Sequence, residues 1–335
     1  MRAVQFLGDR EAAVVTVPDP APGPGQAVLR MVRAAVCGSD LHGYRRPKSA
    51  MPATPVFPGH EPVGVIEALG PGVHGLQVGQ RVLLYHRPGC GVCPQCLSGQ
   101  ANICSGTPRP RSGSDADYEL AYAERFVPLP DDMDWDTAVV IACQAGTAYA
   151  PLKRLGASGR DVLVVSGLGP VGLCAVMLGR AMGAHIIGID PVAERRALAE
   201  RFGAARTINP LDGDLEAQVR AEVPEGADGV IETSGNPAAQ AAAVDLVRVE
   251  GTIAMVGLGH AEPSIAPAKL FRRQVTVFGS NLYAQALLPE IFTFVQRRRV
   301  PLASIITHRF PLAEAPAAFR LADTATTGKI VFTWE

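Results

Sequence analysis

The fold class of this 335-residue chain follows chiefly from one segment, Val162-Leu163-Val164-Val165-Ser166-Gly167-Leu168-Gly169-Pro170-Val171-Gly172. A run typical of a buried strand leads directly into G-x-G-x-x-G, and an apolar helical segment follows over residues 171–182. Gly167 makes the tight turn, Gly169 lets the backbone approach a pyrophosphate at the helix N-terminus, and Gly172 lets helix and strand pack closely. These glycines, with Pro170 and Val171 between them, predict a dinucleotide-binding turn.

Asp190 supports this interpretation. It follows the next predicted strand, residues 186–189, and a carboxylate there accepts hydrogen bonds from the adenosine ribose hydroxyls. The same carboxylate repels a 2′-phosphate, which favours NAD over NADP. Arg195, a second candidate coenzyme contact, and Arg196 lie nearby and keep NADP open as the alternative. The competing interpretation is a Gly-rich turn in an α/β domain that binds no nucleotide.

Strands and helices alternate outward from this stretch. Strands are expected over residues 162–165, 186–189, 229–232, 252–256 and 274–279, and helices over 135–142, 145–155, 171–182, 193–202 and 238–247. Such alternation predicts right-handed crossovers and a doubly wound parallel sheet. Before residue 135 the chain is β-rich, with strands expected over residues 28–36, 62–70 and 81–85. The fold class is therefore α/β.

Length and patterning give the expected domains. About 150 residues per domain predicts two domains. We expect the β-rich domain to comprise residues 1–145 together with 286–335, because the tail is too short for an ordinary domain of its own. The parallel-sheet domain then covers residues 146–285.

Composition excludes several classes of protein. Apolar residues make up 47% and charged residues 19%, a globular balance, and a net charge of −1 gives no overall attraction to nucleic acid or an acidic membrane. Residues 162–179 carry no formal charge, but glycines and a proline interrupt them, so we expect a strand, a turn and a helix and no membrane span. With no targeting segment visible, we expect a cytoplasmic protein without a nucleic-acid or membrane partner.

Seven cysteines, an odd number, argue against a fully paired disulfide framework. Four of them form Cys90-x2-Cys93-x2-Cys96-x7-Cys104, a spacing with which a short chain segment can wrap one Zn²⁺ in four thiolates. The sequence predicts a structural zinc lobe over residues 87–106. An iron–sulfur cluster is an alternative on ligand type. A nucleic-acid-binding zinc knuckle is a second alternative, which the scattered flanking basic residues disfavour.

Two further segments bring metal-ligating residue types to the ends of predicted strands. Cys37-Gly38-Ser39-Asp40-Leu41-His42 follows one strand, and Gly59-His60-Glu61 precedes the next. A thiolate, an imidazole and a carboxylate suit a catalytic zinc that keeps one coordination position open. Taken singly, each residue is equally consistent with an ordinary buried structural group.

Taken together, these segments resemble the zinc-dependent medium-chain alcohol dehydrogenase family over essentially the full length. Matching segments are Cys37–His42, Gly59–Glu61, the four-cysteine lobe, the Gly-rich turn, Asp190, Asp228–Gly235 and Gly328–Val331. The resemblance implies a GroES-like β-rich catalytic domain, a Rossmann NAD-binding domain and two zinc ions per chain. It also implies a homodimer or homotetramer, with the sheet edge near residues 275–282 as the expected contact.

The resemblance further implies the ligands of the catalytic zinc. Cys37, His60 and Cys143 match the ligand positions, and Asp40 matches the carboxylate that orients His60. Glu61 stands next to the metal, as a transient or direct ligand. Polyol dehydrogenases of the family usually have Glu where this chain has Cys143, so the ligand set is of the alcohol type.

Two polar residues match the family's proton relay. The resemblance implies that Ser39 and His42 pass the alcohol proton to solvent; the alternative is that they are ordinary polar turn residues. The alternative for Cys143 is an ordinary buried core residue. Cys174 is expected to be a core residue. Residues 113–119 depart from the pattern of the family. The loop of residues 43–58 is uninformative, because it could equally line a pocket or be solvated.

The implied activity is reversible hydride transfer between a primary or secondary alcohol and NAD, in which zinc polarises the substrate oxygen. The alternative function is a polyol, sugar or amino-alcohol dehydrogenase that uses the same zinc mechanism. A zinc-free reductase of the wider superfamily is disfavoured by the ligand residues. A nucleotide- or zinc-binding structural protein is the non-enzymatic alternative.

Overall fold

A computed structural model describes residues 1–109, 112–259 and 265–334. The chain divides into two compact units. The first unit comprises Met1–Cys143, Ala284–Phe292 and Ile306–Glu335, and the second comprises Gln144–Tyr283 and Thr293–Ile305. The C-terminal part of the chain therefore contributes to both units.

A seven-stranded sheet organises the first unit. Its strands follow the order β14-β15-β3-β4-β5-β7, with β6 also paired to β3, and every pairing is antiparallel except that of β14 with β15. The strands of this unit, including a separate β1–β2 hairpin, are β1 (Arg2–Gly8), β2 (Glu11–Thr16), β3 (Gln26–Val36), β4 (Pro62–Leu69), β5 (Arg81–Leu84), β6 (Tyr118–Tyr122), β7 (Phe126–Pro128), β14 (Ile306–Pro311) and β15 (Lys329–Thr333). Its helices are α1 (Asp40–Tyr44), α2 (Pro94–Leu97), α3 (Trp135–Val140), α11 (Ala315–Asp323) and the start of α10 (Leu288–Arg298).

Short helical turns connect these elements. The 3-10 turns of the first unit are η1 (Lys48–Ala50), η2 (Ala101–Ile103), η3 (Ala123–Arg125), η5 (Gln285–Leu287) and η7 (Leu312–Glu314). Asp134 begins α3, because its side chain accepts the Thr137 N–H as an N-cap. The π-helical turn η4 (Ile141–Ala145) then joins α3 to α4 (Gly146–Leu155).

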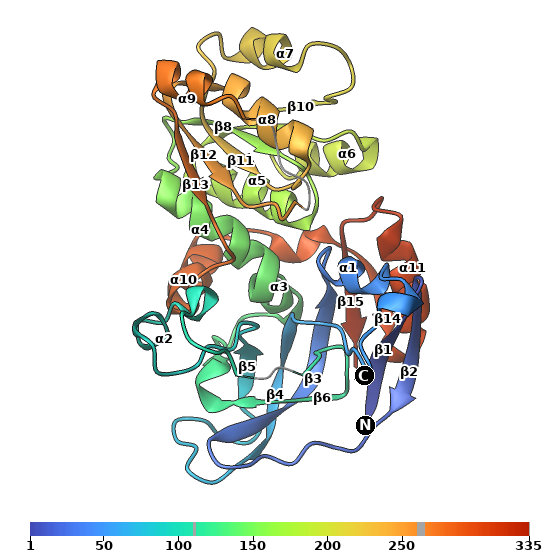
Figure 1. Ribbon diagram of the computed structural model, residues 1–335. Helices are drawn as coiled ribbons and strands as arrows, with labels where there is room; N and C mark the ends of the chain where they lie inside the picture. The colour runs from blue at the N-terminus through green and yellow to red at the C-terminus, as the bar shows by residue number, and fades with distance from the viewer. Residues whose placement is uncertain (110–111, 260–264, 335) are drawn as a thin grey trace. The chain divides into compact units, whose positions relative to one another are not determined.

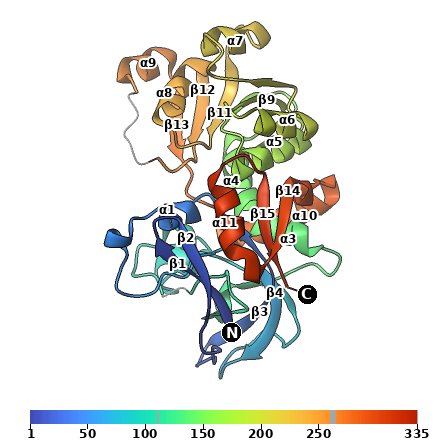
Figure 2. The ribbon, with the colours of Figure 1, turned by 90° about the vertical axis from the view of Figure 1, so that its right-hand side faces the viewer.

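The C-terminal helix α11 packs beside the last two strands, as Figure 2 shows. Its buried Phe319 forms an edge-to-face pair with Phe6 and stacks on Tyr44. Burying three aromatic rings contributes several kcal/mol, because each fully buried large apolar side chain contributes about 1.5–3 kcal/mol. Residues from both ends of the chain thus share one core.

A six-stranded, all-parallel sheet organises the second unit (Figure 1). The strand order β10-β9-β8-β11-β12-β13 is that of a Rossmann fold, and the order of the strands along the sheet reverses between β8 and β11. The strands are β8 (Val162–Ser166), β9 (His185–Ile189), β10 (Arg206–Ile208), β11 (Ala227–Glu232), β12 (Val247–Met255) and β13 (Thr276–Gly279). The other helices of this unit are α5 (Pro170–Met182), α6 (Ala193–Arg201), α7 (Leu215–Glu222), α8 (Pro237–Leu246), α9 (Pro267–Arg273) and the turn η6 (Leu302–Ile305).

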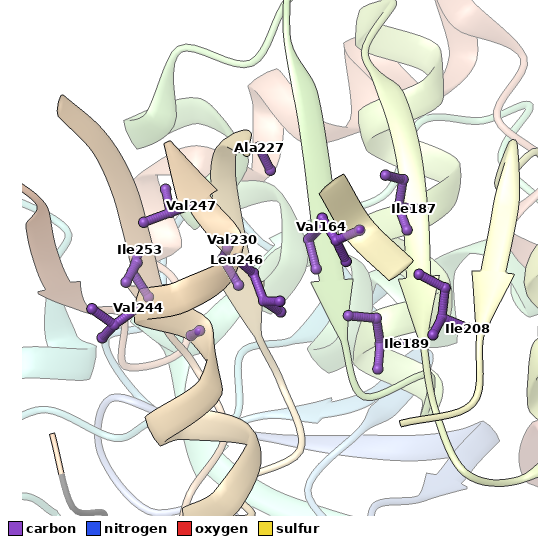
Figure 3. Packing of buried hydrophobic residues seen from close by; sticks show 12 residues of the cluster. Val164, Ile187, Ile189, Ile208, Ala227, Val230, Val244, Leu246, Val247 and Ile253 are labelled. Atoms are coloured by element: carbon purple, nitrogen blue, oxygen red, sulfur yellow. The ribbon is translucent and has the colours of Figure 1, made fainter. Parts of the chain in front are cut away.

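The parallel strands are buried, as their nearly continuous apolar sequences require. Figure 3 shows side chains of the strands and of α8 in one cluster, with Val230 close to Leu246. Val164, Val230 and Ile253, on three neighbouring strands, are fully buried. This packing fixes the carboxyl ends of β8, β9 and β11, where dinucleotides bind in such sheets.

The predicted fold class is confirmed, and so are the predicted strands and helices of the parallel sheet, to within a few residues at most ends. In the second unit, β10, α7 and α9 were not predicted from the sequence. Residues 135–142 and 145–155 were predicted as two separate helices, whereas a π turn makes them continuous. Within the described residues, no helix has both the length and the apolar character needed to cross a bilayer.

Candidate metal centres and dinucleotide site

The four cysteines of the predicted lobe converge on one point. The sulfur atoms of Cys90, Cys93, Cys96 and Cys104 all lie within 4.8 Å of one another. Backbone N–H groups point inward: Cys93 N–H donates to the Cys90 sulfur at 3.3 Å, and Cys96 N–H donates to the Cys93 sulfur at 3.4 Å. Four sulfur atoms this close, with no disulfide among the seven cysteines, form a donor set that fits a tetrahedral zinc.

The electrostatics of the lobe also favour a cation. Hydrogen bonds from backbone N–H groups, chiefly that of Cys96, lower the pKa of Cys93 to about 5. Burial instead raises the pKa of Cys96 to about 12. Neighbouring thiols therefore oppose one another's ionisation unless a cation sits between them.

A second cluster contains Cys37, His60, Glu61 and Cys143, with ligand atoms all within 4.8 Å of one another. The Cys143 sulfur lies 3.8 Å from His60 Nε2. A hydrogen bond from the Cys143 thiol lowers the pKa of Cys37 well below its usual value. Two sulfurs, an imidazole nitrogen and a carboxylate oxygen form a donor set that fits zinc. The structure thus brings together four residues that the sequence analysis had singled out.

Asp40 forms hydrogen bonds with two residues of this cluster. One of its carboxylate oxygens accepts the His60 Nδ1–H at 3.1 Å, and the other accepts the Cys37 N–H at 2.9 Å. Because Nδ1 carries the hydrogen, the lone pair of His60 Nε2 faces the cluster, as a metal ligand requires. One carboxylate therefore orients two of the four cluster residues.

Lys329 was missed as a site residue by the sequence analysis. Its fully buried ammonium lies 2.6 Å from a Glu61 carboxylate oxygen and donates to the Val36 carbonyl at 2.7 Å. Burial raises the pKa of Glu61 to about 7, although Lys329 opposes this change. The only signal in the sequence was the Gly328–Val331 segment, which matched the family without giving Lys329 a role.

Ser39 and His42 lie on the exposed surface at the start of α1, outside the cluster of ligand atoms. The His42 N–H donates to the Ser39 carbonyl at 3.3 Å, as in a helical turn. Their roles as proton relay stay predictions. Cys174 is fully buried in α5, as expected for a core residue.

Asp115 is a second residue that the sequence analysis did not single out. Its carboxyl group is buried against Gly59, and among the described residues neither of its oxygens has a hydrogen-bond partner. Burial, followed by the nearby Asp40 carboxylate, raises the pKa of Asp115 well above its ordinary value. In the loop of residues 43–58, Tyr44 belongs to the core and Arg45 pairs with Asp323, so neither is a free pocket-lining group.

The Gly-rich turn has the geometry that the sequence predicts. Gly167 has a φ of +89°, and a Cβ on Gly172 would lie 1.9 Å from the Gly167 carbonyl oxygen, so both positions require glycine. A Cβ on Gly169 would meet no atom within 4 Å. Gly169 therefore faces open space at the N-terminus of α5, where backbone N–H groups attract anions.

Asp190 stands beside this turn. Its carboxylate accepts the Leu168 N–H at 2.7 Å and the Val192 N–H at 2.8 Å. Arg195 lies 3.9 Å from the same carboxylate, whereas one guanidinium nitrogen of Arg196 donates to two backbone carbonyls.

A cavity of about 630 Å³ opens on the Asp190 side of the turn. Asp190, Arg195 and Asn236 are among the polar residues that line it. Its apolar lining includes Leu211, Leu215 and Leu246. The size and the mixed lining suit an adenosine moiety. The predicted cofactor residues Gly167, Asp190 and Arg195 thus lie around one cavity in the second unit.

Thr233 ties the turn to the neighbouring strand. It follows β11, and its hydroxyl donates to the Gly167 carbonyl at 2.7 Å. Next to it, the buried Glu232 carboxylate accepts the Ser234 N–H at 2.8 Å. These contacts fix the two loops at the point where the strand order reverses.

Comparison with known proteins agrees with this geometry. Residues 23–131 match the alcohol dehydrogenase GroES-like domain family, and residues 170–297 match the zinc-binding dehydrogenase family. An uncharacterized zinc-type alcohol dehydrogenase-like protein of Escherichia coli (strain K12) is 33% identical, over 99% of this chain and 98% of its own length. An alcohol dehydrogenase of Geobacillus stearothermophilus is 32% identical, over 82% of this chain and 83% of its own length.

A solved structure gives the same result for the whole fold. The alcohol dehydrogenase TADH from Thermus sp. ATN1 superposes with a TM-score of 0.93 at 29% identity, and each chain is covered completely. The fold and the two cysteine-containing clusters define a zinc-type dehydrogenase. The chain belongs to the zinc-dependent medium-chain alcohol dehydrogenase family, and it is an oxidoreductase that acts on CH–OH groups.

Proposed function

We propose that the protein is a zinc-dependent, NAD-linked alcohol dehydrogenase that interconverts a primary or secondary alcohol and its carbonyl compound. The observation that carries the proposal is the convergence of Cys37, His60, Glu61 and Cys143 within 4.8 Å. The first unit acts as the catalytic domain and the second as the coenzyme domain. Relatives with names such as L-threonine 3-dehydrogenase and sorbitol dehydrogenase keep an amino-alcohol or polyol substrate as the second candidate.

In this proposal Cys37, His60 and Cys143 hold the catalytic zinc, and the four lobe cysteines hold a structural one. A zinc held there with an open position would polarise an alcohol oxygen and lower the pKa of its hydroxyl group. Asp40 keeps the His60 ring in the ligating orientation through its 3.1 Å hydrogen bond. Lys329 offsets the negative charge of Glu61, so that a carboxylate can stay beside two thiolates.

The remaining chain residues handle the proton and the coenzyme. Ser39 and His42, exposed two and five positions after Cys37, are suited to pass the alcohol proton to solvent. Bound NAD would supply a nicotinamide ring as the hydride acceptor, and Gly169 would hold its pyrophosphate. Asp190 favours NAD because its carboxylate disfavours a 2′-phosphate, and one guanidinium nitrogen of Arg196 is already engaged with backbone carbonyls.

The protein is proposed to work as a homo-oligomer in the cytoplasm. The edge strand β13 of the parallel sheet carries the exposed Val277. An exposed edge strand is a template for pairing with a second copy. Light scattering of the purified protein decides between monomer, dimer and tetramer.

The test combines zinc analysis with an NAD-coupled substrate panel. Wild-type protein is expected to hold two zinc ions per chain and to reduce NAD with simple alcohols faster than with sorbitol or threonine. Cys37→Ser is expected to lose one zinc and the activity, whereas the matched control Cys174→Ser, at a core cysteine, keeps both. Retention of zinc and hydride transfer in Cys37→Ser contradicts the proposal. Faster turnover of sorbitol or threonine favours the second candidate.

A further inference from the structure

We infer that His86 positions the Cys143 thiol for metal binding, by hydrogen bonding from its ring to the backbone beside that cysteine; this inference rests on the function proposed above. His86 is not one of the clustered ligand residues, and the sequence analysis assigned it no role. It is a positioning residue, because it acts through the backbone and not through contact with substrate or metal.

The first observation is the hydrogen bond itself. His86, two residues past β5, is 4% exposed, and its Nδ1 lies 3.1 Å from the carbonyl oxygen of Ala142. A carbonyl can only accept, so Nδ1 carries the hydrogen and donates it. The bond therefore fixes both the tautomer and the orientation of the ring.

The second observation is the kind of backbone that receives this bond. Ala142 and Cys143 lie in the π-helical turn η4, between two ordinary helices. A π turn inserts one residue into a helix, redirects the following side chains, and occurs often at functional sites. Holding the Ala142 carbonyl thus constrains the turn at the residue that precedes the ligand.

The third observation is the location of the ring. The His86 and His60 ring centroids are 5.7 Å apart, and His60 Nε2 is 3.8 Å from the Cys143 sulfur. His86 therefore packs against one member of the cluster while it anchors the backbone of another. Such supporting contacts hold ligands in place, and their loss typically costs 10–100-fold in metal affinity.

The experiment uses the full-length protein loaded with Co²⁺, whose thiolate charge-transfer band reports directly on cysteine ligation. We compare wild type with His86→Phe, which keeps a ring without a donor, and with His86→Asn, whose amide can donate near the Nδ1 position. A chelator competition gives the affinity of each site. His185→Phe, at an exposed position on β9, is the matched control.

His86→Phe is expected to weaken Co²⁺ binding at the Cys37–Cys143 site by about 10–100-fold and to reduce its thiolate band. The four-cysteine site and NADH binding should not change, which also shows that the variant is folded. His86→Asn should recover most of the affinity, and His185→Phe should match wild type.

The inference is overturned if His86→Phe binds Co²⁺ at this site as tightly as wild type, or if His86→Asn is as weak as His86→Phe. Should His86→Phe not fold, a His86→Asn variant that binds as wild type supports the inference, and one that has lost the site overturns it. A wild-type protein without a thiolate band from Cys37 and Cys143 is a different result, because it refutes the proposed function itself.

Discussion

Gly169 offers a sharp test of the dinucleotide site, because the free protein has room for a side chain there. A Cβ at this position would meet no atom within 4 Å, and the φ of −66° is one that alanine adopts readily. We therefore expect Gly169→Ala to fold normally. Loss of backbone freedom in the unfolded chain stabilises the variant by about 0.4–1 kcal/mol, and a poorer N-cap costs a similar amount.

The effect on coenzyme binding should be much larger. If the pyrophosphate lies against Gly169, the added methyl group occupies its space, and overpacking of that kind costs about 1–3 kcal/mol. At 1.4 kcal/mol per tenfold change, the Kd for NADH should rise by about 5–150-fold. NADH fluorescence titration measures the Kd, and urea unfolding measures the stability.

Gly172→Ala is the matched comparison. Its Cβ would lie 1.9 Å from the Gly167 carbonyl oxygen, so this variant should lose stability in the absence of coenzyme. Wild-type affinity for NADH in Gly169→Ala would show that the coenzyme does not approach the turn at this residue, contrary to the proposed pyrophosphate site.

Three further substitutions test residues around the coenzyme turn and the metal-ligand cluster. Asp190→Ala should lower the preference for NAD over NADP at least tenfold in kcat/KM, since it removes the carboxylate that repels a 2′-phosphate; an unchanged ratio counts against that role. Thr233→Val loses the 2.7 Å hydrogen bond to the Gly167 carbonyl, worth about 1 kcal/mol of folding free energy, so urea unfolding should show a loss of about that size, and unaltered stability would be the wrong result. Asp115 has a raised pKa in the folded protein, so wild-type stability should fall as pH rises above about 4, by up to about 1.4 kcal/mol per unit while the folded group keeps its proton. Asp115→Asn should escape this loss, and parallel stability curves for the two proteins between pH 4 and 7 would contradict it.

Local sequence patterns predicted the features that are formed by residues close together in the chain. The Gly-rich turn combines a strand, a positive φ at Gly167 and a helix N-terminus, and all three leave a signature within a dozen residues. The lobe is equally local, since Cys90 to Cys104 span one short segment. Family resemblance supplied Cys143, because nothing in its apolar helical surroundings distinguishes a ligand from a core residue.

Contacts between distant segments could not be predicted in this way. Lys329 and Val36 are 293 positions apart, and only the pairing of β15 with β3 brings them together near Glu61. His86 reaches Ala142 through the fold as well, and the π turn that receives its bond has no periodicity that separates it from an α-helix. The three-residue strand β10 is too short for alternation to appear.

We propose that this chain builds two different zinc sites from six of its seven cysteines. X-ray absorption at the zinc edge, combined with metal analysis of the purified protein, tests it most directly. Two zinc ions per chain are expected: one with four sulfur ligands, and one with two sulfurs, from Cys37 and Cys143, plus the nitrogen of His60. The average is then three sulfur neighbours per zinc. One zinc per chain with four sulfur neighbours would contradict the claim, because the Cys37 site would then hold no metal.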